Sequence, residues 1–329
     1  MRSGYIKGAD QRVGMTNAGE GTRTTPHLNR RSVLAATGTL GLSGCLGSDA
    51  GSVRVLSAGS LARTFEDHVG PAFESVTGTA VHGEYYGANA VMRMVEDRTK
   101  HPDVIVSADA TLLRDRLYDS VARWDVEFAT NSLGVGYNDG TTLGRRLEAG
   151  DPWYEVVSEA DEGDLSIGDP DLDPLGYRAI QAFELAEAEH DLEEFKKRME
   201  KSAYREPEEP QMMAGVESGS RAAAIVYRNM AVDHDMPFLE FPPAYSFSDP
   251  ELAAHYATAE YTTDEEGYTA AGRPILYNAT VHTEADAPDL GRRLVRFLAD
   301  NPDVLAEAGL TVGEYLPRTN GAVPEGVGV

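Results

Sequence analysis

Alternation between short β-branched runs and helical stretches is the feature that most constrains the fold of this chain. In the helical stretches, apolar residues recur every three or four positions. The predicted order is strand 53–56, helix 61–76, strand 80–86, helix 88–99 and strand 102–106. Strands and helices that alternate at this spacing predict βαβ units and a mostly parallel sheet with helices packed on it.

A second α/β domain is predicted after these elements. Residues 128–137 form an apolar run with small side chains, which we expect to cross into the second domain as a strand. A long helical stretch from about 174 to 199 follows there, and residues 273–281 are predicted to return as a second crossing strand. The expected boundaries place domain I at 46–130 and 272–329, and domain II at 131–271.

The segment before domain I is interpreted as an export signal. Arg30 and Arg31 precede roughly a dozen mildly apolar residues, a run that is too short to span a bilayer. Paired arginines in this position are typical of the twin-arginine export route. The sequence Leu-Ser-Gly-Cys that ends at Cys45 resembles a lipobox, in which residues up to Gly44 are removed and the cysteine is lipidated. We therefore expect a lipoprotein anchored to the outer face of the cell membrane.

Charge excludes one class of partner. The chain has 54 acidic and 29 basic residues, and its formal net charge is -25. Nucleic acid is excluded as a partner, because phosphate binding requires clustered Lys and Arg. Carboxylates recur along the whole chain, which favours a salt-adapted, halophilic organism, with a generic acidic secreted protein as the alternative.

Common catalytic motifs are absent from the sequence. The eight histidines show no zinc-site spacing, and no nucleotide-binding glycine motif or G-x-S-x-G motif occurs. Carboxylates are so frequent that any pair of them carries little information about acid–base catalysis. We predict that the protein is not an enzyme, and an exported hydrolase with a carboxylate pair in a cleft remains the alternative.

Three loops place small residues where a helix is predicted to begin. They are Ala58-Gly59-Ser60-Leu61, Gly87-Ala88-Asn89-Ala90 and Asp173-Pro174-Leu175-Gly176. The first amides of a helix lack intrahelical partners, and the helix dipole gives them partial positive charge. If such loops converge on a cleft, they form an anion site without Lys or Arg. Ordinary helix capping is the competing interpretation.

An ordered set of motifs makes the interpretation specific. From about Val53 to Pro317, the chain resembles the tungstate/molybdate-binding proteins of archaeal ABC importers. The motifs that carry the resemblance are Ser57-Ala58-Gly59-Ser60-Leu61, Ala108-Asp109, Phe128-Ala129-Thr130-Asn131, Asp173-Pro174-Leu175-Gly176-Tyr177-Arg178, Val226-Tyr227-Arg228-Asn229 and Arg273-Pro274-Ile275-Leu276-Tyr277. The resemblance implies a two-domain type II periplasmic-binding-protein fold, with a ligand cleft between two α/β domains that are joined by two crossing strands.

The resemblance also implies a set of ligand-binding residues. Carried over by motif, these are Gly59, Ser60, Ala88, Asp173, Pro174, Leu175, Glu209 and Tyr227. The family has Gly-Ser in the second loop, where this chain has Gly87-Ala88, so that only the main-chain N–H of Ala88 can serve there. The family turn Asp-Pro-Cys corresponds to Asp173-Pro174-Leu175. Glu208, next to Glu209, is the alternative glutamate ligand.

The resemblance implies that carboxylates help to bind a dianion. In the family, Asp and Glu oxygens approach the metal of the oxyanion itself, and Asp173 and Glu209 are expected to do so here. Because sulfur and phosphorus do not expand their coordination in this way, we expect sulfate to be rejected by charge repulsion. The implied ligand is tungstate or molybdate, with no cofactor, and sulfate, phosphate or a small carboxylate is the alternative. The implied partners are an ABC permease and its ATPase, and we expect a monomer.

Overall fold

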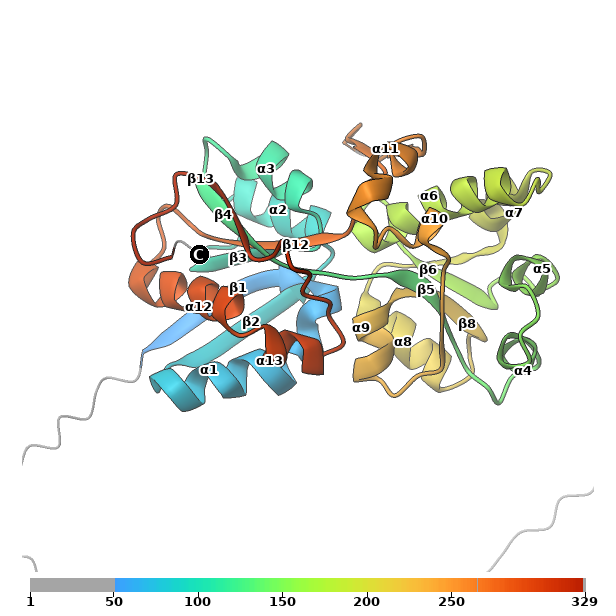
Figure 1. The fold of residues 1–329 in the computed structure, drawn as a ribbon, viewed down its shortest axis with the longest axis horizontal. Coiled ribbons are helices and arrows are strands. Elements are labelled where there is room, and N and C mark those ends of the chain that lie inside the picture. Colours follow the sequence, from blue (N-terminus) through green and yellow to red (C-terminus); the bar gives the residue numbers. More distant parts are fainter. Residues whose placement is uncertain (1–50, 265, 328–329) are drawn as a thin grey trace, which may run out of the picture. The chain divides into compact units, whose positions relative to one another are not determined.

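Two large sheets organise residues 51–264 and 266–327, the part of the chain that the computed structural model describes (Figure 1). These residues belong to one compact unit. The predicted export signal and Cys45 lie outside the described residues. No helix in the described part is long and apolar enough to cross a membrane.

The first lobe is built around a sheet of six described strands in the order β13-β4-β12-β3-β1-β2. Strand β1 pairs in parallel with β2 and β3, whereas β12 runs antiparallel to β3 and β4. The strands are β1 (Ser52–Ala58), β2 (Ala80–Tyr86), β3 (Val104–Ser107), β4 (Trp124–Thr130), β12 (Leu276–Val281) and β13 (Arg318–Gly321). The helical elements are η1 (Gly59–Leu61), η2 (Thr64–Val69), α1 (Gly70–Thr77), α2 (Ala88–Glu96), α3 (Ala110–Leu117), α12 (Pro288–Asp300) and α13 (Pro302–Glu307).

The second lobe is built around a sheet of five described strands in the order β7-β6-β8-β5-β9. The strands are β5 (Leu133–Tyr137), β6 (Leu165–Gly168), β7 (Tyr204–Glu206), β8 (Ala223–Tyr227) and β9 (Phe238–Glu240). The helices are α4 (Thr142–Glu148), α5 (Trp153–Ser158), α6 (Pro174–Glu189), α7 (Phe195–Ser202), α8 (Glu209–Glu217), α9 (Arg228–Asp233), α10 (Pro243–Ser246), η3 (Pro250–Leu252) and α11 (Ala253–Tyr256). A small ribbon of β10 (Glu260–Thr262) and β11 (Thr269–Ala271) completes the described elements.

Most strands of each large sheet run in one direction. In the first sheet only β12 and β13 oppose the other described strands, and in the second sheet only β5 does so. The predicted two-domain α/β fold class is confirmed, with two mixed sheets that carry flanking helices, and the chain crosses between the lobes at β4–β5 and again before β12 (Figure 1).

Three predicted elements are interrupted in the structure, one strand and two helices. The single strand predicted over 128–137 is two strands, because β4 pairs in the first sheet and β5 in the second, with Asn131 and Ser132 between them. The small side chains of β5 are required by packing: a β-carbon on Gly134 would lie 2.4 Å from the carbonyl oxygen of Leu239.

The predicted helices 61–76 and 174–199 are also divided. The first contains the π-helical turn η2 immediately before Pro71, which has no N–H to continue the helical hydrogen-bond pattern. The second is divided into α6 and α7, because Asp191 and Glu194 have positive φ angles of 52° and 51°.

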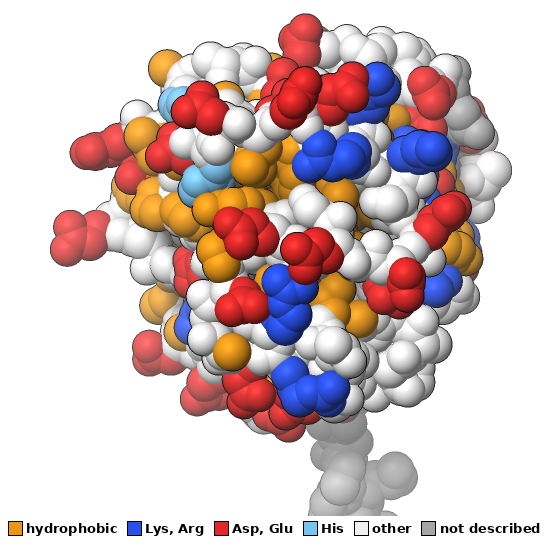
Figure 2. All heavy atoms as spheres, turned by 90° about the vertical axis from the view of Figure 1, so that its right-hand side faces the viewer, with side chains coloured by type: hydrophobic (Ala, Val, Ile, Leu, Met, Phe, Trp, Pro, Cys, Tyr) orange, Lys and Arg blue, Asp and Glu red, His pale blue; other side chains and the backbone are white. Residues whose placement is uncertain are grey.

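Acidic side chains on the surface are dispersed. On the face that carries α4, α5 and α7, carboxylates are interspersed with basic and apolar side chains and do not gather in one patch (Figure 2). This distribution keeps the surface hydrated without creating a single site that attracts cations.

The carboxyl ends of four strands bring the predicted site residues to the boundary between the lobes. Strand β1 ends immediately before Gly59, and β2 ends immediately before Gly87. In the second lobe, β6 leads into the loop that ends at Asp173, and β8 ends at Tyr227. Open α/β sheets bind ligands at the carboxyl ends of their strands, so the topology places these residues where a ligand is expected.

Candidate functional site

Two glycines of the first lobe lie directly against the second lobe. A β-carbon on Gly59 would lie 2.0 Å from Oε2 of Glu209. A β-carbon on Gly87 would lie 2.3 Å from the carbonyl oxygen of Leu172 and 3.1 Å from Cβ of Asp173. The two first-lobe loops therefore approach the predicted carboxylate ligands at distances that only glycine allows.

The N-terminus of α2 is partly occupied by the opposite lobe. The amides of Asn89 and Ala90 donate to the carbonyl oxygen of Leu172, at 3.1 Å and 3.3 Å. The side-chain amide of Asn89 donates to the carbonyl oxygen of Asp171 at 3.3 Å. These contacts leave the first amide of the helix, that of Ala88, which is the amide that the sequence predicts for the anion.

Asp173 caps α6 from the second lobe. Its Oδ1 accepts a hydrogen bond from the amide of Leu175 at 3.1 Å, and Pro174 occupies the first helical position. Gly176 permits this turn to pack against β6, because a β-carbon there would lie 2.5 Å from the carbonyl oxygen of Gly168. The Leu175 amide thus orients the Asp173 carboxylate. Contact between Leu175 and a ligand stays a prediction.

Three carboxylate oxygens of the site have no hydrogen-bond partner outside the carboxylate pair itself. Oδ2 of Asp173 and both Oε atoms of Glu209 are buried and unpaired. The two residues are only 3% and 6% exposed. Glu208 instead faces solvent and accepts a hydrogen bond from the side-chain amide of Gln211 at 2.9 Å. Of the two adjacent glutamates, Glu209 is the buried one, whereas Glu208 borders a cavity beside it from the exposed side.

Burial and proximity change the protonation of this carboxylate pair. Burial raises the pKa of Glu209 well above its usual value, and the negative charge of the neighbouring Asp173 adds to the rise. Burial also raises the pKa of Asp173. Two buried carboxylates beside each other do not readily carry two negative charges, so the pair holds a proton to a higher pH than an isolated carboxyl group does.

Tyr227 lies fully buried beside a buried arginine. Its hydroxyl oxygen accepts a hydrogen bond from Nη1 of Arg178 at 2.7 Å. The same nitrogen donates to the carbonyl oxygen of Ala108 at 2.9 Å, and Nη2 of Arg178 lies 3.2 Å from Oδ2 of Asp109. Arg178 belongs to α6 in the second lobe, and Asp109 caps α3 in the first, so this ion pair joins the lobes.

Asp109 is held as a carboxylate by the residues around it. Burial acts to raise its pKa, but the charges of Arg178 and Arg273 and the hydroxyl of Tyr177 hold the pKa below its usual value. The Tyr177 hydroxyl donates to Oδ2 of Asp109 at 2.8 Å. Sequence reasoning quoted Asp109 and Arg178 within motifs but assigned neither a role, because their contact spans 69 residues of sequence.

A second buried polar chain lies behind Ser60, whose side chain is 4% exposed. The hydroxyl of Tyr277 donates to Oγ of Ser60 at 3.5 Å and accepts from Nδ2 of Asn131 at 3.1 Å. The carbonyl oxygen of Ser60 accepts from Nδ2 of Asn229 at 2.6 Å. The sequence analysis assigns no role to Asn131, Asn229 or Tyr277, although all three lie within the motifs quoted there.

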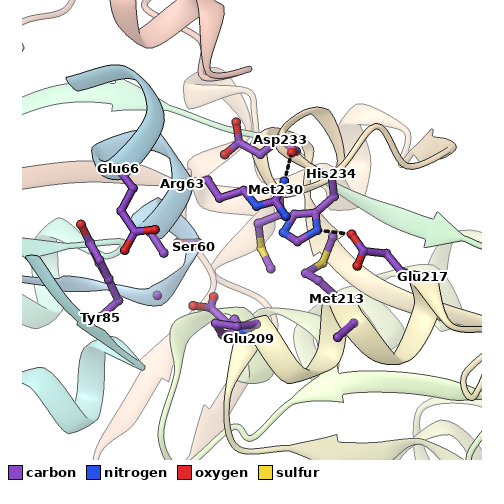
Figure 3. Close-up of a pocket in the computed structure, with 14 residues that line it drawn as sticks. Ser60, Arg63, Glu66, Tyr85, Glu209, Met213, Glu217, Met230, Asp233 and His234 are labelled. Atoms are coloured by element: carbon purple, nitrogen blue, oxygen red, sulfur yellow. Dashed lines mark hydrogen bonds and ion pairs between the residues drawn. The ribbon is translucent and has the colours of Figure 1, made fainter. Parts of the chain in front are cut away.

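Cavities open on both sides of Glu209. One of about 410 Å³ is lined by both lobes, and Figure 3 shows Glu209 at its floor, between Ser60 and Tyr85 on one side and Met213 on the other. A second cavity of about 210 Å³ borders Gly87, Leu172 and Glu209. Among the described residues, no group of three or more His, Cys, Asp or Glu side chains is arranged to hold a metal cation. Ser60 and Glu209 line the larger cavity between the lobes, whereas Asp173 and Tyr227 are buried and line neither of these two cavities.

Known proteins of several kinds are similar to this chain. An uncharacterized solute-binding protein of Halobacterium salinarum is 49% identical, over 92% of this chain and 98% of that protein. A putative ABC transporter molybdenum-binding protein of Haloferax volcanii is 38% identical, over 90% of this chain and 96% of that protein. The molybdate/tungstate-binding protein WtpA of Thermococcus kodakarensis is 26% identical, over 74% of this chain and 77% of that protein.

A solved structure and a family model agree with these relatives. The periplasmic molybdate-binding protein of Azotobacter vinelandii shares the fold, with a TM-score of 0.60 at 15% sequence identity, over 80% of this chain and 100% of that chain. The family model of bacterial extracellular solute-binding proteins matches residues 53–310. The chain belongs to this family of extracellular solute-binding proteins.

Proposed function

We propose that this protein captures molybdate or tungstate in the cleft between its lobes and delivers it to an ABC permease. The observation that carries the proposal is the set of three buried, unpaired carboxylate oxygens on Asp173 and Glu209. Buried polar atoms without partners are unfavourable in a folded protein and call for an explanation. A ligand that accepts carboxylate oxygens into its own coordination sphere supplies one.

Molybdate and tungstate have the chemistry that these oxygens require. A hard, high-valent metal centre prefers oxygen donors, so the carboxylates of Asp173 and Glu209 approach the metal while its four oxo groups face hydrogen-bond donors. Those donors are the hydroxyls of Ser60 and Tyr227 and the amide of Ala88. Gly59 leaves the space in which Glu209 reaches the ligand, and Leu175 and Pro174 hold the carboxylate of Asp173 at the helix start.

The same carboxylates select against abundant anions. Sulfate offers them no metal centre to coordinate, so that its charge meets two carboxylates at short range in a buried site. Repulsion of this kind discriminates between two dianions of similar shape. The names of the relatives from Haloferax volcanii and Thermococcus kodakarensis support the same ligand class.

Transport then depends on closure of the two lobes around the anion. Residues of both lobes contact the ligand, so the ligand stabilises the closed arrangement by its greater affinity for it. The segments next to Asn131 and before β12 act as the hinge.

The protein itself works as a monomer without turnover, and the permease and ATPase are separate chains. The lipid on Cys45 anchors the binding protein to the outer face of the cell membrane of a salt-adapted organism.

Calorimetric titration tests the proposal. The purified protein is titrated in high salt with molybdate, tungstate, sulfate, phosphate and a small carboxylate such as acetate. Binding of one molybdate or tungstate per chain, with no competition from equal sulfate, supports the proposal. Comparable competition by sulfate contradicts coordination by the carboxylates. Binding of phosphate or acetate alone assigns the site to another anion, and turnover of a candidate ester or glycoside would favour the hydrolase alternative.

A further inference from the structure

We propose that two buried hydrogen-bond relays fix the hydroxyls of Tyr227 and Ser60 as donors toward the bound anion. Arg178 forms the first relay, and Asn131 with Tyr277 forms the second. These three are positioning residues, since each acts through a hydroxyl that contacts the ligand. The inference rests on the proposed function, because it concerns the same anion site.

The first relay follows from the chemistry of the guanidinium group. Nη1 of Arg178 carries two hydrogens, and these are directed to the hydroxyl oxygen of Tyr227 at 2.7 Å and the carbonyl oxygen of Ala108 at 2.9 Å. A guanidinium group donates hydrogen bonds and accepts none. The Tyr227 oxygen is therefore the acceptor, and its own proton must be donated elsewhere. Within the described residues, the Tyr227 hydroxyl donates to no other group.

Arg178 is held in place from the opposite lobe. Its Nη2 donates to Oδ2 of Asp109 at 3.2 Å, and the Tyr177 hydroxyl donates to the same oxygen at 2.8 Å. Its side chain is 1% exposed. Because one partner lies in each lobe, the orientation of the Tyr227 hydroxyl is tied to the contact between the lobes that this structure shows.

The second relay starts from an amide whose orientation is determined. Oδ1 of Asn131 accepts from the amide of Ser132 at 2.9 Å, so Nδ2 is its donor side. Nδ2 donates to Oδ1 of Asn229 at 2.8 Å and to the hydroxyl oxygen of Tyr277 at 3.1 Å. Tyr277 then directs its proton to Oγ of Ser60 at 3.5 Å. The Ser60 oxygen accepts this long hydrogen bond on the side that faces the protein, so the proton of Ser60 itself is available to the ligand.

Both relays have the same effect on the site. Each hydroxyl accepts a hydrogen bond on the side that faces the protein, and each must donate on the other side. Donors that are already oriented bind an oxyanion without the entropic cost of ordering them. Ser60 and Tyr227 are thereby matched to a ligand whose exposed atoms are acceptors, as the oxo groups of molybdate are.

Substitution of the relay residues, without change to the hydroxyls themselves, tests the inference. Tyr277→Phe keeps the ring and removes only the hydroxyl, and Arg178→Gln removes the guanidinium donor. Each single variant is titrated with molybdate. Two double variants are titrated in the same way: Tyr277→Phe combined with Ser60→Ala, and Arg178→Gln combined with Tyr227→Phe. Each single substitution is expected to weaken binding roughly tenfold, as loss of a hydrogen bond to a charged group does. Each double variant is expected to bind about as weakly as its hydroxyl variant alone, since the relay acts through that hydroxyl.

Two controls separate positioning from structural damage. Arg178→Lys, which keeps the charge and one donor, is expected to recover part of the lost affinity. Arg114→Gln breaks another partly buried ion pair, with Asp125 and Glu127, and is expected to lower the melting temperature without changing the molybdate Kd.

The outcomes distinguish the two proposals. If the unaltered protein binds none of the anions, the proposed function fails and the relays fail with it. If it binds molybdate, but the relay variants bind equally well or show losses that add to those of the hydroxyl variants, the relays are wrong and the proposed function stands. If Arg178→Gln does not fold, Tyr277→Phe alone decides.

Discussion

Gly59 of the first lobe lies so close to Glu209 of the second that a β-carbon on the glycine would be 2.0 Å from Oε2 of the glutamate. Glu209 is a flexible side chain, so Gly59→Ala is expected to displace its carboxylate without unfolding the protein. We predict that molybdate affinity falls at least about tenfold, equal to about 1.4 kcal/mol. Calorimetric titration and thermal unfolding measure the two effects separately.

Gly215→Ala is the matched control for Gly59→Ala. Gly215 lies within α8, the helix that begins at Glu209, and its nearest neighbour would be Cγ of Arg221 at 3.2 Å. This substitution is expected to leave the affinity unchanged and to stabilise the helix by roughly 0.5–1 kcal/mol. Equal loss of affinity in both variants would show that α8, and not the contact between Gly59 and Glu209, controls binding.

Gly87→Ala is predicted to be more severe than Gly59→Ala. Its β-carbon would lie 2.3 Å from the carbonyl oxygen and 2.8 Å from the carbonyl carbon of Leu172. Both are backbone atoms, so the two lobes must separate to admit the methyl group. We expect a protein that remains folded but closes poorly, with a larger radius of gyration by small-angle scattering and no compaction when molybdate is added. Compaction equal to that of the unaltered protein would contradict the prediction.

Binding is predicted to release protons. Burial raises the pKa of both Glu209 and Asp173, and their mutual repulsion adds to the rise at Glu209, so the empty site holds a proton to a higher pH than an isolated carboxyl group does. Coordination to a metal requires deprotonated carboxylates, so about one proton should leave for each molybdate bound. Titration in two buffers with different ionisation enthalpies measures this number. The affinity should fall as the pH is lowered.

Glu208→Gln is the matched control for Glu209→Gln in this experiment. Glu208 is the exposed neighbour, which borders the smaller cavity and accepts a hydrogen bond from Gln211, so its substitution is expected to change affinity and proton release much less than substitution of Glu209. Glu209→Gln is expected to abolish both. Proton release that persists in Glu209→Gln would assign the proton to another group.

Much of the fold and part of the candidate site were predictable from sequence because they depend on local signals. The β-branched runs, the helical periodicity and the small residues after β1 and β2 are all contained in short segments. The cap of α6 by Asp173 is local too, because the Leu175 amide that donates to Asp173 lies only two residues later in the chain.

The contacts between the lobes were not predictable in the same way. The Leu172 carbonyl accepts the amides of α2 only because a loop of the second lobe approaches that helix, more than 80 residues earlier in the chain. The bonds from Arg178 to Asp109 and from Asn131 to Tyr277 likewise span 69 and 146 residues. Propensity and spacing do not encode such pairings, because these depend on how the two sheets meet.

Asp233 is predicted to make stability depend on pH. Its side chain is 4% exposed and lies 3.8 Å from Nε2 of His68 in the other lobe. Burial raises its pKa from 3.8 to about 6, although the charges of His68 and Arg63 oppose the rise. A carboxyl group with a raised pKa binds a proton more tightly in the folded protein than in the unfolded chain, so its contribution to stability is complete below about pH 4 and is lost as the pH rises to about 6.

Asp233→Asn is expected to remove this dependence. A shift of this size corresponds to about 2–3 kcal/mol of unfolding free energy across the interval, measured by denaturant titration at pH 4, 5, 6 and 7 in high salt. Because asparagine is neutral at every pH, the unfolding free energy of Asp233→Asn at pH 7 should resemble that of the unaltered protein near pH 4. The carboxylates of the cleft titrate in both proteins and so contribute equally to both profiles. Asp235→Asn, which changes an exposed carboxylate two residues later, should leave the profile as it was. An unchanged slope in Asp233→Asn would mean that the cleft pair Asp173 and Glu209 carries the whole pH dependence.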